Sequence, residues 1–401
     1  MIFHYRATRS SSTLKTCLTL CFIAIGSLAS PSISVFARDI AAGTSALASQ
    51  LELAGNNRPE IQRAISEAPE TQQAAMRFLV ENMPAGDLQT LSADFLLRHV
   101  DLAFTAREEA NWGHQIPEDL FFNEVLPYAN VNELRDDVRQ QLRDQFWPAV
   151  SNLDSISLAA ARLNREVFKQ TGVKYSTKRR RADQGPAETM ETGLASCTGL
   201  SILLIDTYRA CGIPARFVGT PLWSDNSGNH SWVEVWDDGW HFTGAAEPTG
   251  DDLNKAWFTD RASKAVAGGK HGIFAVSFKK TDTRFPLVWS RNESAVFAVD
   301  VTERYAQKQP ATSLDLFEVQ FRALSAPKAD RCQANLIVKD QAGNVVFRGQ
   351  TNDESADANN HLAAKLKPGK YTVQLTTAKG KQEQTIEVDQ DAKLVTLIAP
   401  Q

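Results

Sequence analysis

Cys197 and His230 are the residues whose types and settings most clearly predict chemistry in this chain. Cys197 follows Ser196 at the start of an amphipathic stretch that closes with a Gly-Ile-Pro phrase at residues 212–214. Serine is a typical helix N-cap, and glycine followed by proline is a typical helix end. The thiol is therefore expected in the first turn of a helix, where unpaired N–H groups and the helix dipole favour a thiolate.

His230 supplies the proton acceptor that a thiol nucleophile needs. It begins the β-branched and aromatic run HSWVEVW, residues 230–236, which is typical of a strand, and lies 33 residues after Cys197. A helix packed on a sheet can bring the two side chains together. The predicted chemistry is attack of a thiolate on a carbonyl. A cysteine at a helix start is by itself more often a small packed residue than a nucleophile. The prediction of a nucleophile therefore depends on the cysteine, the histidine and their surrounding motifs taken together.

Three further residues are candidates for the substrate cleft. Thr198 is small and leaves room for a carbonyl, Gln184 could donate to an oxyanion, and Trp232 could line a groove. A zinc site from Cys197, His230 and His241 is a second interpretation, although no CxxC or HxxxH spacing supports it. The predicted chemistry needs no metal or other cofactor.

The phrase SCTGLSILLIDTYRACGIPARFVG followed by NHSWVEVWDDGW resembles the transglutaminase-like superfamily of cysteine enzymes. The resemblance covers about residues 175–249. It implies a papain/transglutaminase-like core in which a helix bearing Cys197 packs on an antiparallel sheet, with Cys197 as nucleophile and His230 as base. It also implies a protein or peptide-like substrate and a thioester intermediate. Calcium, used by some members, has no recognisable loop here.

The resemblance breaks at the third catalytic position. An Asp on the strand after His230 is expected to orient the imidazole, but this chain has Gly244 at that place. If Asp238 and Gly239 form a two-residue turn, Glu247 lies opposite His230 and is the predicted orienting carboxylate. A three-residue loop would shift that pairing by one residue. Alternatively, Glu247 caps a loop and the site is a Cys-His dyad or inactive.

The elements that must position these residues predict an α+β chain in several parts. Residues 38–172 carry helical spacing, including residues 130–150, with Ser92 and Ser155 as N-caps and Gly172 as a stop. Residues 173–305 hold the core, with short strand-like runs. Residues 310–401 alternate with period two around Gly and Pro-Gly turns and predict a β-sandwich. This last part resembles transthyretin-like, carboxypeptidase-regulatory-like modules.

Residues 1–37 predict a secretory signal peptide, because basic residues precede an apolar run at residues 18–29 and a small-x-small cleavage pattern. An uncleaved anchor is the alternative. We therefore expect a secreted, periplasmic or cell-envelope protein without stable membrane insertion after cleavage. The remainder has a net charge of about −7, since residues 1–37 hold three basic and no acidic residues, which does not favour nucleic acid as a partner.

Two functions follow from the residues and the resemblance. The first is an exported cysteine-dependent protease, amidase or transglutaminase acting on peptide-like amide bonds. The second is a catalytically inactive binding or scaffold protein of the cell envelope, which the glycine at position 244 favours. The sequence does not indicate the oligomeric state. Cys211 and Cys332 are expected to be unpaired, because Cys211 lies on the apolar face of its helix, and a Cys211–Cys332 disulfide with Cys197 free is the alternative.

Overall fold

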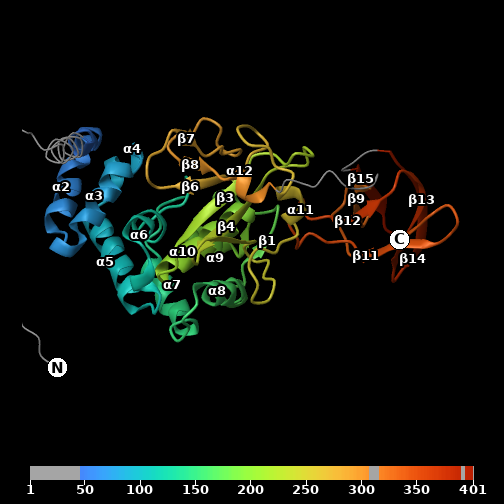
Figure 1. Ribbon diagram of the computed structural model, residues 1–401, viewed down its shortest axis with the longest axis horizontal. Coiled ribbons are helices and arrows are strands. Elements are labelled where there is room, and N and C mark those ends of the chain that lie inside the picture. Colours follow the sequence, from blue (N-terminus) through green and yellow to red (C-terminus); the bar gives the residue numbers. More distant parts are fainter. Residues whose placement is uncertain (1–45, 307–315, 390–392, 401) are drawn as a thin grey trace, which may run out of the picture. The chain divides into compact units, whose positions relative to one another are not determined.

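The computed structural model describes residues 46–306, 316–389 and 393–400 (Figure 1). Helices come first, a six-stranded sheet with its helices follows, and two smaller sheets end the chain, which is the α+β class expected from the sequence. The predicted signal peptide lies outside the described residues. Within the described part, no helix is both long and apolar enough to cross a membrane. The domain boundaries given above stay predictions.

The helices before residue 172 bury their apolar faces in one large core. The predicted caps at Ser92 and Ser155 are confirmed, since each side chain accepts a hydrogen bond from the N–H three residues ahead. Gly172 ends its helix with a φ of 69°, in the left-handed region that favours glycine. These helices are α2 (Arg58–Glu67), α3 (Gln73–Asn82), α4 (Ala85–Thr90), α5 (Ala93–Glu109), α6 (Glu118–Glu124), α7 (Arg139–Phe146) and α8 (Ile156–Thr171).

Helix α7 covers only part of the helix expected over residues 130–150, so that prediction is wrong for its first half. The carboxylate of Glu133 accepts hydrogen bonds from the N–H groups of Asn130 at 2.6 Å and Val131 at 2.8 Å. A side chain that binds the neighbouring backbone in this way offers it an alternative to the helix. Apolar spacing does not report such local competition.

The central sheet is antiparallel, with strand order β5-β4-β3-β6-β8-β7. Helix α10 (Cys197–Ala210) packs on β3 and β4, as expected for the helix bearing Cys197 (Figure 1). A short parallel pair, β1 (Lys174–Tyr175) and β2 (Leu194–Ala195), leads into α10. The other elements are α9 (Pro186–Thr192), α11 (Thr259–Ala262), α12 (Thr302–Tyr305), β3 (Ala215–Thr220), β4 (His230–Trp236), β5 (Trp240–Thr243), β6 (Phe274–Ser277), β7 (Thr283–Arg284) and β8 (Phe297–Asp300).

The β4–β5 hairpin has a three-residue loop, and the two-residue turn used to select Glu247 is wrong. Trp236 pairs with Trp240, which leaves residues 237–239 in the loop. Asp238 adopts a φ of 53°, a left-handed conformation that Asp tolerates better than most side chains. Because β5 ends at Thr243, the strand pairing stops before it reaches the level of His230.

Two sheets near the C-terminus share a second apolar core and form the expected sandwich. One sheet has the order β11-β10-β13-β14 and the other β12-β9-β15, where β15 runs parallel to β9. The resemblance to transthyretin-like modules remains a prediction. The strands are β9 (Phe317–Leu324), β10 (Asn335–Lys339), β11 (Val345–Gln350), β12 (Leu362–Leu366), β13 (Gly369–Thr377), β14 (Gly380–Val388) and β15 (Lys393–Ile398).

Candidate active site

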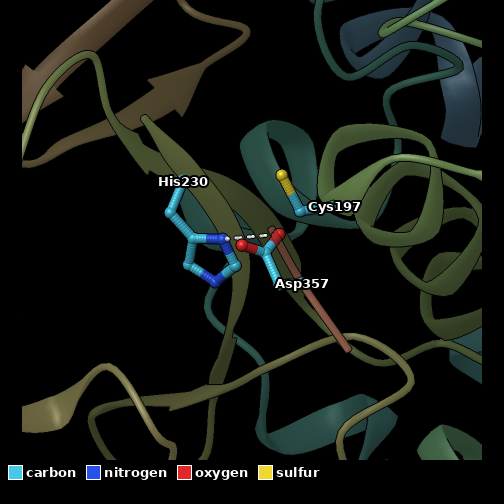
Figure 2. Close-up of side chains that lie close together, drawn as sticks. All are labelled: Cys197, His230 and Asp357. Carbon is cyan, nitrogen blue, oxygen red and sulfur yellow. Dashed lines mark ion pairs between the residues drawn. The ribbon is translucent and has the colours of Figure 1, made fainter. Parts of the chain in front are cut away.

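Cys197, His230 and Asp357 converge at one point (Figure 2). Their Sγ, ring nitrogen and carboxylate oxygen atoms lie within 4.8 Å of one another. Cys197 opens α10 and His230 opens β4, whereas Asp357 lies on the long segment between β11 and β12. The structure therefore brings the two expected residues together with a carboxylate from the C-terminal sheets.

The local sequence at the start of α10 leaves one backbone donor open beside the thiol. Ser196 caps the helix, because its Oγ accepts hydrogen bonds from the N–H groups of Thr198 at 3.1 Å and Gly199 at 3.3 Å. Among the described residues, no hydrogen bond uses the N–H of Cys197 itself. This N–H is therefore available to an oxyanion formed on the carbon that Cys197 attacks.

His230 is buried among aromatic rings, with 2% of its surface exposed. Its ring centroid lies 4.9 Å from those of Trp257 and Phe258. Its Nδ1 forms an ion pair with Asp357 Oδ2 at 3.5 Å. Burial acts to lower the pKa of His230, but the proximity of Asp357 and then of Cys197 outweighs it and raises this pKa to about 10. The arrangement favours the imidazolium form of His230.

Hydrogen bonds from Arg331 hold the backbone of the segment that carries Asp357. The guanidinium of Arg331 donates to the carbonyls of Ala356 at 2.6 Å and Asp357 at 3.0 Å. The N–H of Asn359 donates to Asp357 Oδ1 at 2.8 Å. Burial acts to raise the pKa of Asp357, but His230, this N–H and the Arg331 charge outweigh it and hold the pKa below its usual value.

Two hydrogen bonds attach the same segment to the neighbourhood of Cys197 and His230. The N–H of Ala358 donates to the hydroxyl of Tyr175, which lies on β1, at 2.9 Å. The side-chain amide of Asn359 donates to the carbonyl of Asn229, the residue before His230, at 3.0 Å. Asp357 is therefore held at the imidazole by bonds on both sides of it.

Glu247 lies half-buried near the imidazole without pairing with it. Both carboxylate oxygens accept from Trp257 Nε1, at 2.9 and 3.0 Å, and the ring of Trp257 contacts His230. Burial raises the pKa of Glu247 to about 7, against the lowering effect of the His230 charge. Glu247, which was expected to orient His230, thus holds the ring of Trp257 beside the imidazole. Asp357 makes the ion pair with His230.

Gly244 leaves the space that Glu247 occupies. A Cβ at Gly244 would lie 2.2 Å from Glu247 Oε2 and 3.1 Å from Glu247 Cβ. The glycine at position 244 and the placement of the Glu247 carboxyl are therefore one structural feature, because a side chain at position 244 would compete with Glu247 for the same volume.

The three expected cleft residues lie in different surroundings. The amide of Gln184 donates to Thr192 Oγ1 and to the carbonyl of Leu194, both at 3.1 Å, so it is committed to the loop before α10. Trp232 is fully buried and donates from Nε1 to the hydroxyl of Tyr305 at 2.9 Å. Thr198 lines the groove, but its N–H is used by the helix cap.

A groove of about 270 Å³ borders Cys197 on the side of Asp357. Apolar surface comes from Tyr175, Val288 and Trp289, and Arg179 is the basic side chain among the described residues that line it. Other lining residues are Thr177, Ala182, Ser196, Thr198, Asn229, Ala358 and Asn359. The groove gives a substrate access to the thiol, and its tryptophan is Trp289 instead of the expected Trp232.

The three converging groups have two chemical uses. They can act as nucleophile, base and orienting carboxylate, or their sulfur, nitrogen and oxygen atoms can hold a metal ion such as zinc. His241, the third ligand of the zinc interpretation, is bonded to the carbonyl of Asp237 and to Asn254, so it belongs to the β4–β5 hairpin.

Sequence reasoning missed Asp357, Tyr175, Arg179 and Trp289. A signal for Asp357 was present, since residues 351–361 form a long Asp- and Asn-rich connection between two strands, where hairpin loops are usually two to five residues. Long loops of this kind often carry function. Nothing in that pattern indicated which distant residue the carboxylate would meet.

Comparison with known proteins identifies residues 148–244 as a match to the family model described as "Transglutaminase-like superfamily". The match contains Cys197 and His230 and ends before Asp357. No curated protein matches the chain.

Similar solved structures include a candidate cysteine protease from Cytophaga hutchinsonii (15% identity, TM-score 0.28, 48% of this chain and 66% of that one). Another is the Bacillus anthracis TIE protein (12% identity, TM-score 0.18, 47% of this chain and 30% of that one). A third is a red sea bream transglutaminase (9% identity, TM-score 0.29, 70% of this chain and 66% of that one). The chain spans less than two thirds of the length of each of these three proteins.

Proposed function

We propose that the protein is a cysteine-dependent acyl-transfer enzyme that acts on peptide-like amide bonds. The observation that carries the proposal is the convergence of Cys197, His230 and Asp357 within 4.8 Å beside an open groove. The transglutaminase-like match over residues 148–244 supports the same reading.

In the proposed reaction the thiolate of Cys197 attacks the amide carbonyl and the new oxyanion is held by the Cys197 N–H. The C–N bond then breaks, His230 gives its proton to the leaving amine, and a thioester remains. Water or a second amine, deprotonated by His230, attacks the thioester and releases the thiolate. Water yields an acid and an amine yields a new amide, so the acceptor decides between hydrolysis and crosslinking.

The ion pair of His230 with Asp357 supports an active enzyme over an inactive scaffold. Gly244, in place of the carboxylate that the resemblance predicts, favours an inactive protein, but the carboxylate of Asp357 lies at the imidazole. Export remains part of the proposal on the pattern of residues 1–37. The N-terminus of the protein purified from its native host would show whether cleavage follows Ala37.

The test is turnover of a complex peptide mixture, with and without a labelled primary amine, read by mass spectrometry. We expect new peptide termini or amine incorporation that Cys197→Ala abolishes and His230→Ala lowers roughly 10²-fold or more. Cys332→Ala is the matched control, because Cys332 is a half-exposed thiol outside the site, and should keep full activity.

Turnover that survives Cys197→Ala, or that is undiminished in His230→Ala, would disprove this mechanism. Absence of turnover, together with alkylation of Cys197 by iodoacetamide no faster than that of Cys332, would favour the binding protein.

A further inference from the structure

The basic run at residues 178–181 contains a cation, Arg179, that has no acidic partner in the part of the chain that the structure describes. Lys178 pairs with Asp330 at 3.2 Å, Arg180 with Glu191 at 3.0 Å, and Arg181 with Glu188 at 2.9 Å. Among the described residues no carboxylate pairs with Arg179, whose recorded hydrogen bond is from Nη1 to the carbonyl of Thr177 at 2.8 Å. Its Nε is buried and has no partner there.

Arg179 is also the member of this run that lines the groove beside Cys197. Asp357 is the acidic side chain among the described residues that line the groove, and its charge is balanced by the ion pair with His230. A guanidinium that is partly buried and unpaired costs free energy that a bound carboxylate would recover. Its planar set of N–H donors matches a carboxylate in geometry.

We propose that Arg179 binds a carboxylate of the substrate next to the amide that Cys197 attacks, an inference that rests on the proposed function. The preferred substrate is a peptide with an acidic side chain or a free C-terminal carboxylate beside the reacting amide. The apolar walls from Tyr175, Val288 and Trp289 accommodate the rest of the peptide.

Two alkylating reagents of the same size test the charge without a known substrate. Iodoacetate carries a carboxylate and iodoacetamide is neutral; in both, the Cys197 thiolate forms a C–S bond as the C–I bond breaks and iodide leaves. The quantity measured is the ratio of the two rates at Cys197, read by mass spectrometry of the modified peptide. Iodoacetamide alone reports the reactivity of the thiol, so the ratio isolates the effect of charge.

We expect Arg179→Gln to lower the iodoacetate-to-iodoacetamide ratio by about fivefold, as for the loss of one partly screened charge pair. Arg179→Lys should keep most of the ratio, and added salt should reduce it in the wild type. Arg180→Gln is the matched control, because it removes the same charge one residue away. Arg180 is paired with Glu191 and does not line the groove. It should leave the ratio unchanged.

An unchanged ratio in Arg179→Gln, or an equal fall in Arg180→Gln, would overturn the inference while leaving the proposed enzyme intact. Slow alkylation by iodoacetamide in the wild type would instead disprove the reactive thiol.

With turnover established, the two carboxylate sources are separated by peptides that differ in one group. Glu against Gln beside the amide tests the side chain, and a free against an amidated C-terminus tests the terminal carboxylate. At least one pair should show a preference that Arg179→Gln removes; equal kcat/KM within both pairs would overturn the inference.

Discussion

At the scale of single residues, the partner decides the charge of a buried histidine. Burial and the charges of Arg139 and Arg98 lower the pKa of His99 well below the usual value, and the exposed carboxylate of Asp137, 3.7 Å from its Nε2, does not offset them. His361 is half-buried near arginines, and its pKa falls to about 4. His230 is more deeply buried than His361 but faces Asp357 and Cys197, and its pKa rises to about 10. Negative neighbours therefore keep this imidazole protonated in an apolar setting.

Asp357→Asn should narrow the pH range over which His230 is protonated and the enzyme turns over its substrate. Removing the carboxylate removes the largest cause that raises the pKa of His230, so this pKa falls and the imidazolium is lost at lower pH. We expect the alkaline limb of turnover, which needs the imidazolium as the acid, to move down by roughly 1–3 pH units. Turnover near pH 8 should fall roughly 10²- to 10⁴-fold. The measurement is the pH–rate profile of turnover.

Glu247→Gln is the control, because it changes the charge of the carboxyl that is bonded to Trp257 instead of the imidazole. It should move the limb less than Asp357→Asn does. The reverse order would assign the orienting role to Glu247 after all.

At the scale of elements, the end of strand β5 and the glycine after it leave space for the side chain of Glu247. The hairpin loop of residues 237–239 sets the register, β5 stops at Thr243, and Gly244 carries no side chain where the carboxyl lies. Trp257, bonded to that carboxyl, then packs against His230. Near position 244, where the resemblance predicts a carboxylate, the carboxyl of Glu247 thus contacts Trp257 and not the imidazole.

Gly244→Ala should therefore destabilise the fold. The new Cβ would lie 2.2 Å from Glu247 Oε2, so the side chain must move and its hydrogen bonds with Trp257 are lost. Overpacking of this kind costs about 1–3 kcal/mol. The measurement is the free energy of unfolding in urea. Gly86→Ala is the control, since no atom lies within 4 Å of its added Cβ and it lies in helix α4; equal losses in both variants would refute the packing argument.

At the scale of the whole molecule, local sequence patterns predicted the helices and strands better than they predicted which distant residues would contact one another. The caps at Ser92, Ser155 and Ser196 were predictable because each is decided within three residues of the helix start. Most of the strands and the meeting of Cys197 with His230 also followed from patterns within the core.

The link between His230 and Asp357 was not predictable, because 127 residues and a different sheet separate them. Periodicity places a residue on a face of its own element and says nothing of which loop will pack there. The helix expected over residues 130–138 failed for a related reason, since a side-chain carboxylate took the backbone N–H groups.

The ion pair between His230 and Asp357 should make the stability of the whole molecule depend on pH in a defined window. His230 has a folded pKa of about 10, above the roughly 6.5 of an unfolded histidine, so its contribution is complete below pH 6.5 and lost as pH rises toward 10. We expect the free energy of unfolding of the wild type, relative to His230→Asn, to decrease between about pH 6.5 and 10.

His361→Asn provides a control of opposite sign. The folded pKa of His361 is about 4, below its unfolded value, so the unfolded chain binds the proton first and stability falls as pH drops from roughly 6.5 to 4. The difference between wild type and His361→Asn should change in that acidic window and stay flat above it. Urea unfolding of the three proteins from pH 4 to 10 separates the two effects. A flat difference for His230→Asn above pH 6.5 would mean that the imidazole is neutral in the folded protein, and the reactive ion pair would have to be abandoned.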